Sequence, residues 1–290
     1  MSERTRVRTG GTTTRAILAG PGGAKEAAVF VHGNPGSADD WERYVDAAGE
    51  LGRAVALDLP DFGETSAPRG FRHTSDGYAE WLGGALDTLG VRRAHLVLHD
   101  FGGPIGLTWA VSAPERVASV TLIDTGVLPG YRWHRMARIW RTPVLGELFQ
   151  ATTSRWAFRT VIGRTEPQGL PRSFLDQMYD HYDRRTRRAV LRLYRATDDP
   201  NGMRSAVIDA FRSRDVPALV IWGEGDAYLP NAYAERQRDA FPGAEVHVLR
   251  GSGHWPFVDA AAEVERLLTR FLARVAAPSG PAQARPAQVR

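Results

Sequence analysis

The chain has 290 residues, a hydrophobic content of 43% and 37 basic against 33 acidic side chains, which gives a formal charge of +4 at pH 7. This size allows a large core, and we expect one domain with an insertion. The lack of cysteine excludes disulfides, thiolate metal sites and a cysteine nucleophile. No basic stripe interleaved with aromatic residues indicates nucleic-acid binding, and no run approaches the roughly 18 apolar residues of a membrane span. No apolar signal segment follows the polar first residues, so we expect a cytoplasmic protein.

The first part of the chain, residues 1–125, alternates between apolar runs of strand length and amphipathic stretches of helix length. Two short runs around Gly10-Gly11 predict a β-hairpin. Strands that alternate with helices predict a mostly parallel central sheet with helices on both faces, so the predicted fold class is α/β. The predicted strands are 4–8, 12–18, 27–31, 54–59, 94–98 and 117–124, and the predicted helices are 41–51, 74–89 and 104–113.

The alternation stops between residues 126 and 214, where helical stretches carry many aromatic side chains. We interpret this stretch as a helical cap inserted into the α/β core. From Arg132 to Arg214 it contains 17 arginines and eight acidic residues. That excess would either favour an anionic substrate or belong to solvated helix faces.

The strand pattern resumes in a second part of the core, residues 215–275. It predicts strands at 216–222 and 245–249 and helices at 231–240 and 261–274. Residues 276–290 are rich in Pro, Ala and Arg, a composition that predicts a disordered tail.

The stretch from Leu98 to Gly103 has the pattern of a nucleophile elbow. It joins a predicted strand to a predicted helix, and Gly102, two places after Asp100, would let the two approach each other. An aspartate has an unperturbed pKa of about 4, so it is already an anion at neutral pH and can attack without a base. An isolated Asp-x-Gly more often caps a helix, so the catalytic interpretation depends on further residues.

Two further residues follow apolar runs in the same way. Asp226 and His254 each come after a predicted strand, at what would be the carboxyl edge of a parallel sheet, where such folds bind ligands. The chain order of nucleophile, acid and histidine is that of α/β-hydrolases. The turn from His32 to Gly36 could bring backbone N–H groups close to a bound group, or could be a plain loop.

With these motifs, residues 12–274 resemble the α/β-hydrolase superfamily, within its aspartate-nucleophile branch of epoxide hydrolases and haloalkane dehalogenases. The resemblance is weakest in the cap. It implies that Asp100 is the nucleophile, His254 the base and Asp226 the acid that orients the base. Asp124 is an alternative acid, because some dehalogenases place theirs after the strand that follows the nucleophile helix.

The same resemblance assigns an oxyanion hole. His32-Gly33-Asn34-Pro35 matches the His-Gly-x-Pro loop of both families, which implies that the backbone N–H groups of Asn34 and Phe101 hold the oxyanion. No Gly-x-Ser-x-Gly occurs, which argues against a serine esterase.

Choosing between the two families depends on the leaving group. Dehalogenases usually hold the halide between an oxyanion-loop asparagine, which Asn34 matches, and a tryptophan beside the nucleophile. Phe101 stands there and has no N–H, although Trp133 of the cap could substitute. Epoxide hydrolases use cap tyrosines as acids, and Leu193-Tyr194-Arg195 resembles a segment that carries one. The candidates for a second are Tyr131, Tyr179 and Tyr182.

We therefore expect an epoxide hydrolase that forms an alkyl ester on Asp100 and releases a vicinal diol. A haloalkane dehalogenase is the alternative, and a catalytically silent small-molecule-binding scaffold is less favoured. The substrate would be a small apolar or polycyclic epoxide or haloalkane, attacked in the second step by water. No metal or organic cofactor, no nucleic acid and no membrane partner is expected, and the chain could form a homodimer.

Overall fold

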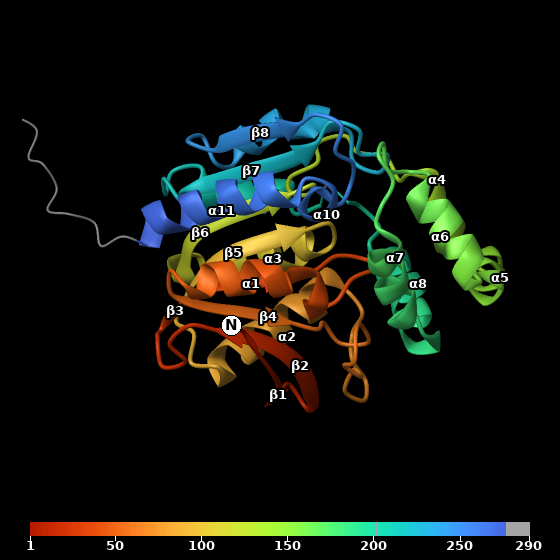
Figure 1. The fold of residues 1–290 in the computed structure, drawn as a ribbon, viewed down its shortest axis with the longest axis horizontal. Coiled ribbons are helices and arrows are strands. Elements are labelled where there is room, and N and C mark those ends of the chain that lie inside the picture. The colour runs from red at the N-terminus through yellow and green to blue at the C-terminus, as the bar shows by residue number, and fades with distance from the viewer. Residues whose placement is uncertain (201, 277–290) are drawn as a thin grey trace, which may run out of the picture.

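The computed structural model describes residues 1–200 and 202–276, with an eight-stranded sheet at its centre (Figure 1). Strand β2 runs antiparallel to β1 and β4, and all other neighbouring strands are parallel. This confirms the predicted α/β class with a mostly parallel sheet. The strands, in spatial order, are β1 (Glu3–Thr9), β2 (Thr12–Ala19), β4 (Arg53–Leu57), β3 (Glu26–Val31), β5 (Arg93–His99), β6 (Val117–Ile123), β7 (Ala218–Gly223) and β8 (Glu245–Leu249).

The inner strands are buried on both faces. Every residue of β4, β6 and β7 is buried, as expected for parallel strands covered by helices on each side. In Figure 1, α1 and α11 lie in front of the sheet, and α2 and α3 lie behind it. Their bounds are α1 (Glu42–Gly49), α2 (Ser75–Thr88), α3 (Gly102–Ser112) and α11 (Ala261–Ala276).

Six helices follow one another between β6 and β7, where the sequence predicts an inserted cap. Figure 1 shows the green helices α4 to α8 gathered beyond one end of the strands. The proposed boundaries of this insertion, 126 and 214, stay a prediction. The helices are α4 (Arg135–Arg141), α5 (Leu145–Thr152), α6 (Arg155–Gly163), α7 (Arg172–Asp180), α8 (Arg184–Ala196) and α9 (Arg204–Phe211).

The helix α8 illustrates why the arginine-rich insertion is helical. Asp183 caps it, and its carboxylate accepts a hydrogen bond from the Thr186 backbone N–H. Ala189, Val190 and Tyr194 lie on its buried face, whereas most of its arginines are outside this face. The helix is therefore amphipathic and turns its apolar side toward the core.

The prediction of a regular helix over 231–240 is wrong. That stretch forms two 3₁₀ turns, η3 (Asn231–Tyr233) and η4 (Glu235–Asp239), with i to i+3 hydrogen bonds. The tighter winding holds Gln237 inward, where its side chain pairs with both backbone polar groups of Val127. Residue 41 likewise ends a short 3₁₀ turn, η1 (Ala38–Trp41), that precedes α1.

Two further predictions concern the C-terminal tail and the absence of a membrane-spanning helix. Of the predicted tail 276–290, Ala276 ends α11, and residues 277–290 lie outside the described residues. Within the described ranges, no helix has both the length and the apolar character that crossing a bilayer requires.

The sheet places its polar strand ends together. Strands β5, β6 and β7 are neighbours, so the turns that follow them meet at one edge. Asp100, Asp124 and Asp226 occupy these turns, and His254 follows β8, the next strand along. The short helix α10 (Pro256–Asp259) begins directly after this histidine loop.

Candidate active site

Asp100 occupies the sharp turn between β5 and α3. Its φ is 46°, in the left-handed region that aspartate tolerates better than most residues. The turn needs glycine nearby: a Cβ on Gly102 would lie 2.2 Å from the Val31 carbonyl oxygen. A Cβ on Gly33 would lie 2.4 Å from the Asp100 Cβ. The predicted elbow is thus present, and it lifts the Asp100 carboxylate above the sheet edge.

Both backbone groups predicted to form the oxyanion hole face this carboxylate. The Asn34 N–H donates to Asp100 Oδ1 over 2.7 Å, and the Phe101 N–H also interacts with the carboxylate. Burial raises the pKa of Asp100, but the hydrogen bond and charge of His254, with the neighbouring His99 and the Phe101 N–H, lower it to about 2. Asp100 is therefore an anion throughout the neutral range.

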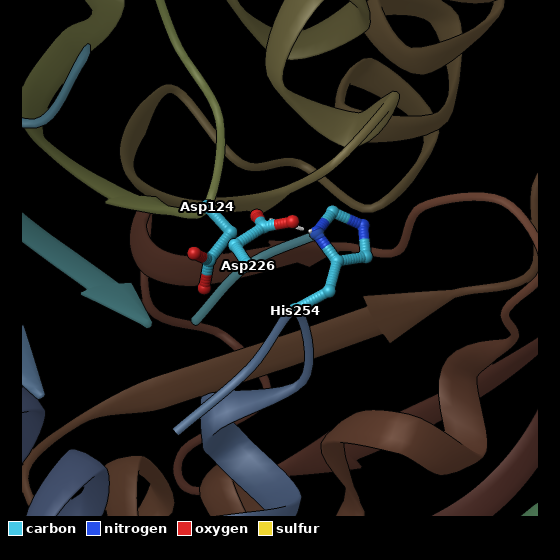
Figure 2. A group of neighbouring side chains, drawn as sticks. All are labelled: Asp124, Asp226 and His254. Atoms are coloured by element: carbon cyan, nitrogen blue, oxygen red, sulfur yellow. Dashed lines mark hydrogen bonds and ion pairs between the residues drawn. The ribbon is translucent and has the colours of Figure 1, made fainter. Parts of the chain in front are cut away.

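His254 lies between two carboxylates. Its Nδ1–H donates to Asp226 Oδ2 over 2.8 Å (Figure 2). Its Nε2 lies 3.5 Å from Asp100 Oδ2. Burial disfavours the imidazolium, yet Asp226 and Asp100 together raise the pKa of His254 well above its usual value. The three side chains that the sequence assigns to a triad are thus brought together in the expected order.

Asp226, and not Asp124, contacts the histidine. Asp226 Oδ1 accepts the backbone N–H groups of Tyr228 and Leu229 over 2.7 and 2.9 Å, which leaves Oδ2 for His254. Asp124 lies beside Asp226, as Figure 2 shows, and accepts the Gly223 N–H over 2.9 Å. Burial, and then the charge of Asp226, raise the pKa of Asp124 well above its usual range, which favours the neutral form of this carboxyl.

Asp124, Asp226 and His254 also have the proximity of a metal-binding group, with one potential ligand atom of each within 4.8 Å of the others. A metal ion there would have to replace the hydrogen bond between Asp226 and His254. The donor set therefore fits a hydrogen-bonded acid and base better than a metal centre.

A cavity of about 550 Å³ opens above Asp100. Its wall is formed mainly by aromatic and aliphatic side chains from α3, the insertion and the loop after β7. None of the described residues that line it is Lys or Arg, although the insertion is rich in arginine. The carboxylates of Asp76, Asp198 and Asp199 line it as well. This arrangement does not favour an anionic ligand.

Tyr194 and Tyr131 contribute hydroxyl groups to this cavity. The Tyr194 ring packs against Phe101 at a centroid distance of 4.8 Å, and its hydroxyl faces the Asn34 side chain. Burial, and then the charge of Asp100, raise the pKa of Tyr194 well above its usual value. Burial also raises the pKa of Tyr131, and the negative charge of Asp100 raises it further. Both phenols are protonated near neutral pH and can donate a proton.

The other two candidate tyrosines lie elsewhere. The Tyr182 hydroxyl accepts a hydrogen bond from Gln150 over 2.8 Å, and the Tyr179 hydroxyl donates to the Thr153 carbonyl over 3.3 Å. Neither lines the cavity above Asp100. The expectation that Tyr179 or Tyr182 contacts the substrate therefore has no geometric support, because both hydroxyls serve packing within the insertion.

Trp133 does line the cavity. Its ring stacks on Phe101 with an interplanar angle of 15°, and its indole N–H is buried without a hydrogen-bond partner among the described residues. Such an unpaired donor could hold a ligand atom that accepts a hydrogen bond.

Three residues near the triad are not among those predicted from the sequence. Tyr228 packs on the His254 ring at 4.9 Å, and its place two residues after Asp226 was an available signal. His134 lines the cavity, and Glu166 is buried close to His254. Neither His134 nor Glu166 stands in a motif, because both lie in loops that connect the inserted helices to each other or to the core.

Known proteins resemble this chain along most of its length. The family model described as alpha/beta hydrolase fold matches residues 28–261. A 2-hydroxy-6-oxononadienedioate/2-hydroxy-6-oxononatrienedioate hydrolase of Paraburkholderia phymatum is 30% identical over 278 residues, which cover 91% of this chain and 92% of that protein.

Two solved structures share the arrangement of elements. A haloalkane dehalogenase from Agrobacterium tumefaciens C58 superposes with a TM-score of 0.81 at 22% identity, covering 94% of this chain and 97% of that one. An epoxide hydrolase from Vigna radiata superposes with a TM-score of 0.76 at 19% identity, covering 94% and 98%. At such identities the likeness concerns the fold and leaves the substrate open.

Proposed function

The chain belongs to the α/β-hydrolase fold family and is a hydrolase, and we propose that it opens epoxides to vicinal diols through an ester on Asp100. The observation that carries this proposal is the state of the Asp100 carboxylate. One of its oxygens is held by backbone N–H groups, and the other faces His254 at 3.5 Å. A carboxylate that attacks a saturated carbon forms a stable ester, whereas attack on a carbonyl carbon would give a reactive anhydride.

In the first step, Asp100 Oδ2 would attack an epoxide carbon while the carbon–oxygen bond of the ring breaks. The Tyr194 hydroxyl would give its proton to the departing oxygen, with Tyr131 as a second donor. Burial keeps both phenols protonated, and both line the same cavity as Asp100, which supports their role as proton donors. The product is a hydroxyalkyl ester of Asp100.

In the second step, water would attack the carbonyl carbon of this ester. Esterification removes the Asp100 charge, so His254 loses one of the two anions that favour its protonated form and can act as a base. His254 takes a proton from the water, and Asp226 stabilises the resulting imidazolium. Asp100 Oδ1 becomes the oxyanion and is already bound by the Asn34 N–H. The bond between Cγ and Oδ2 then breaks, and the departing alkoxide takes the proton of the new Asp100 carboxyl group to give the diol. The proton on His254 returns to the tyrosinate, which restores the starting state.

The substrate named for the sequence relatives is a less suitable candidate. Those relatives are hydrolases of dienedioates, which carry two carboxylates. The described wall of this cavity offers no Lys or Arg, and it contains Asp76, Asp198 and Asp199. A dianion would find no Lys or Arg partner in this wall, whereas an uncharged apolar epoxide matches its aromatic side chains.

Dehalogenation is the second candidate, because one observation favours it. The Trp133 indole N–H faces no partner among the described residues, and the Asn34 side-chain amide makes no hydrogen bond of normal geometry. Trp133 stacks on Phe101, and the Asn34 backbone binds Asp100. Both groups could therefore bind a departing halide. The first attack by Asp100 and the hydrolysis of its ester would be the same in both reactions.

The test separates the two half-reactions. His254→Gln should still form the ester and should fail to hydrolyse it, because only the second step needs the base. Intact-protein mass spectrometry after incubation with aryl and alkyl epoxides, or with bromo- and chloroalkanes, identifies the adduct. The mass of the whole epoxide supports the proposal, and the mass of the haloalkane less its halide supports the alternative.

The matched control is the double variant Asp100→Asn/His254→Gln, which should gain no mass because the neutral amide is a poor nucleophile of the same shape. A silent binding scaffold predicts no adduct in either variant. Absence of any adduct on a substrate that the wild-type protein turns over would contradict the ester mechanism.

A further inference from the structure

The connection between α6 and α7 reaches from the inserted helices to both loops that carry the triad base and acid. Thr165 Oγ1 lies 3.1 Å from the Tyr228 hydroxyl, and Gln168 Nε2 donates to the Gly251 carbonyl over 2.9 Å. Pro167 packs so closely on the acid loop that a Cβ on Gly225 would lie 2.5 Å from its Cγ. The residues 165–168 thus touch the Asp226 loop and the His254 loop at once.

Glu166 lies in the middle of this segment, and its side chain is directed into the protein. It is 5% exposed, and neither carboxyl oxygen has a hydrogen-bond partner of normal geometry among the described residues. A Cβ on Gly253 would lie 1.8 Å from Glu166 Oε2, so the carboxyl group rests on the backbone just before His254. A buried acid without a partner is costly and calls for a physical explanation.

The groups that influence the Glu166 carboxyl come from the two triad loops and from α10. His254 faces it from the base loop, Asp226 and Tyr228 from the acid loop, and Asp259 from α10. Burial is the largest influence on the carboxyl and raises its pKa to about 7, and the nearby acids raise it further, whereas His254 lowers it. Glu166 is therefore charged above neutral pH and uncharged below, and its favourable charged neighbour is the histidine.

We propose that Glu166 is a positioning residue for the hydrolysis of the Asp100 ester, whose carboxylate stabilises the His254 imidazolium from the backbone side of the ring. The inference rests on the proposed two-step reaction. In the ester, Asp100 carries no charge and burial favours the neutral form of Asp124, so Asp226 would otherwise be the main anion beside the base. Glu166 supplies a second negative charge at the moment when the water proton reaches His254.

The test uses Glu166→Gln, which keeps the size of the side chain and removes its charge. Ester formation and ester loss are followed by rapid quenching and mass spectrometry between pH 5.5 and 9.5 with an epoxide that the wild type turns over. The acid limb of the pH–rate profile for ester hydrolysis, where the rate falls as the pH is lowered, reports the protonation of His254. It should move down by about one pH unit in the variant, because a nearby anion favours the protonated ring. The alkaline plateau should fall about threefold to tenfold, and the rate of ester formation should stay the same.

Two further variants distinguish charge from packing. Gln168→Ala removes a hydrogen bond of the same segment without changing its charge, and the acid limb should stay where the wild type has it. Glu166→Asp keeps the charge, so its acid limb should return most of the way to the wild-type position. A purely structural role for Glu166 predicts slower half-reactions in both Glu166→Gln and Gln168→Ala with no change of the acid limb, and that result would overturn the inference.

A second measurement needs no substrate. Titration of the His254 imidazole by NMR in the free protein should show its pKa lowered by about one unit in Glu166→Gln relative to wild type. If no Asp100 ester forms at all, the proposed function fails while this titration still tests the pairing of Glu166 with His254. An unchanged titration in Glu166→Gln would refute the pairing.

Discussion

Asp100 combines three properties that a nucleophile for saturated carbon needs. Its turn conformation exposes the carboxylate above the sheet edge, and its pKa of about 2 keeps it ionised at neutral pH. The Asn34 N–H binds Oδ1 alone over 2.7 Å. The two oxygens are thereby different before any substrate binds, and the geometry assigns attack to Oδ2 and the later oxyanion to Oδ1.

Tyr194 provides the first prediction. Tyr194→Phe should slow the formation of the Asp100 ester from an epoxide by roughly a hundredfold to ten-thousandfold, because the departing alkoxide loses its proton donor. The effect would be smaller if Tyr131 shares the role. Pre-steady-state measurement of ester formation checks this prediction.

Tyr182→Phe is the matched control, since it removes a phenol whose hydroxyl pairs with Gln150 away from the cavity. It should leave ester formation near the wild-type rate. An unchanged rate in Tyr194→Phe would transfer the acid role to another side chain, and Tyr131 would be examined next.

At the scale of elements, the strand ends were the predictable part of the site. Asp100, Asp226 and His254 could be found because each follows an apolar run, and carboxyl ends of adjacent parallel strands meet at one edge. The family resemblance favours Asp226 as the acid, but position along the chain does not exclude Asp124, since both follow strands. The choice depends on which carboxylate the Tyr228 and Leu229 N–H groups orient toward the histidine.

The inserted helices were the unpredictable part. Their helical character follows from sequence periodicity, but which tyrosine faces the nucleophile depends on how the helices pack on the core. Tyr194 and Tyr182 both lie on buried positions of the insertion, and only the resemblance of the segment Leu193-Tyr194-Arg195 favours Tyr194 in the sequence. Glu166 has no local signal at all, because its importance arises from contact with Gly253, far along the chain.

The two neighbouring acids give a prediction at this scale. Asp226→Asn should slow ester hydrolysis by about a hundredfold to ten-thousandfold, because the amide no longer stabilises the imidazolium or orients the ring. Asp124→Asn should slow it less than threefold, because burial already favours the uncharged form of Asp124 and the amide keeps its shape and its bond to the Gly223 N–H.

Single-turnover decay of the ester in each variant is the measurement. If the two substitutions had equal effects, or if Asp124→Asn were the more damaging, Asp124 would be the working acid and the assignment of Asp226 would be wrong. Melting temperatures of both variants show whether either loss reflects unfolding instead.

At the scale of the whole molecule, the inserted helices are attached to the core through polar contacts on the side of α7 and α8. His181, which follows α7, lies 3.0 Å from Asp39 of η1, and Asp39 also pairs with Arg15 over 2.9 Å. Thr186 of α8 donates to the Asp61 carbonyl over 2.9 Å. Together with the contacts of residues 165–168 to the triad loops, these contacts fix the inserted helices over the cavity above Asp100.

The pair of His181 and Asp39 makes this attachment dependent on pH. The hydrogen bond to Asp39 is the largest influence on His181 and raises its pKa in the folded protein above the unfolded value of about 6.5. A histidine with a raised folded pKa stabilises the fold fully below pH 6.5, and this contribution disappears as the pH rises through the folded pKa. His181→Gln should therefore lower the melting temperature most at pH 5.5 to 6 and least near pH 9.

The expected size follows from the partial burial of the pair. A contribution of about 1 kcal/mol corresponds to a difference of about 2 °C in melting temperature for a chain of this length. The comparison of wild type with His181→Gln at each pH removes the titration of other groups, such as Asp40 and Glu166, whose pKa values burial raises to about 7. A difference that is constant across the range, or that grows with pH, would show that the protonated pair does not hold the inserted helices to the core.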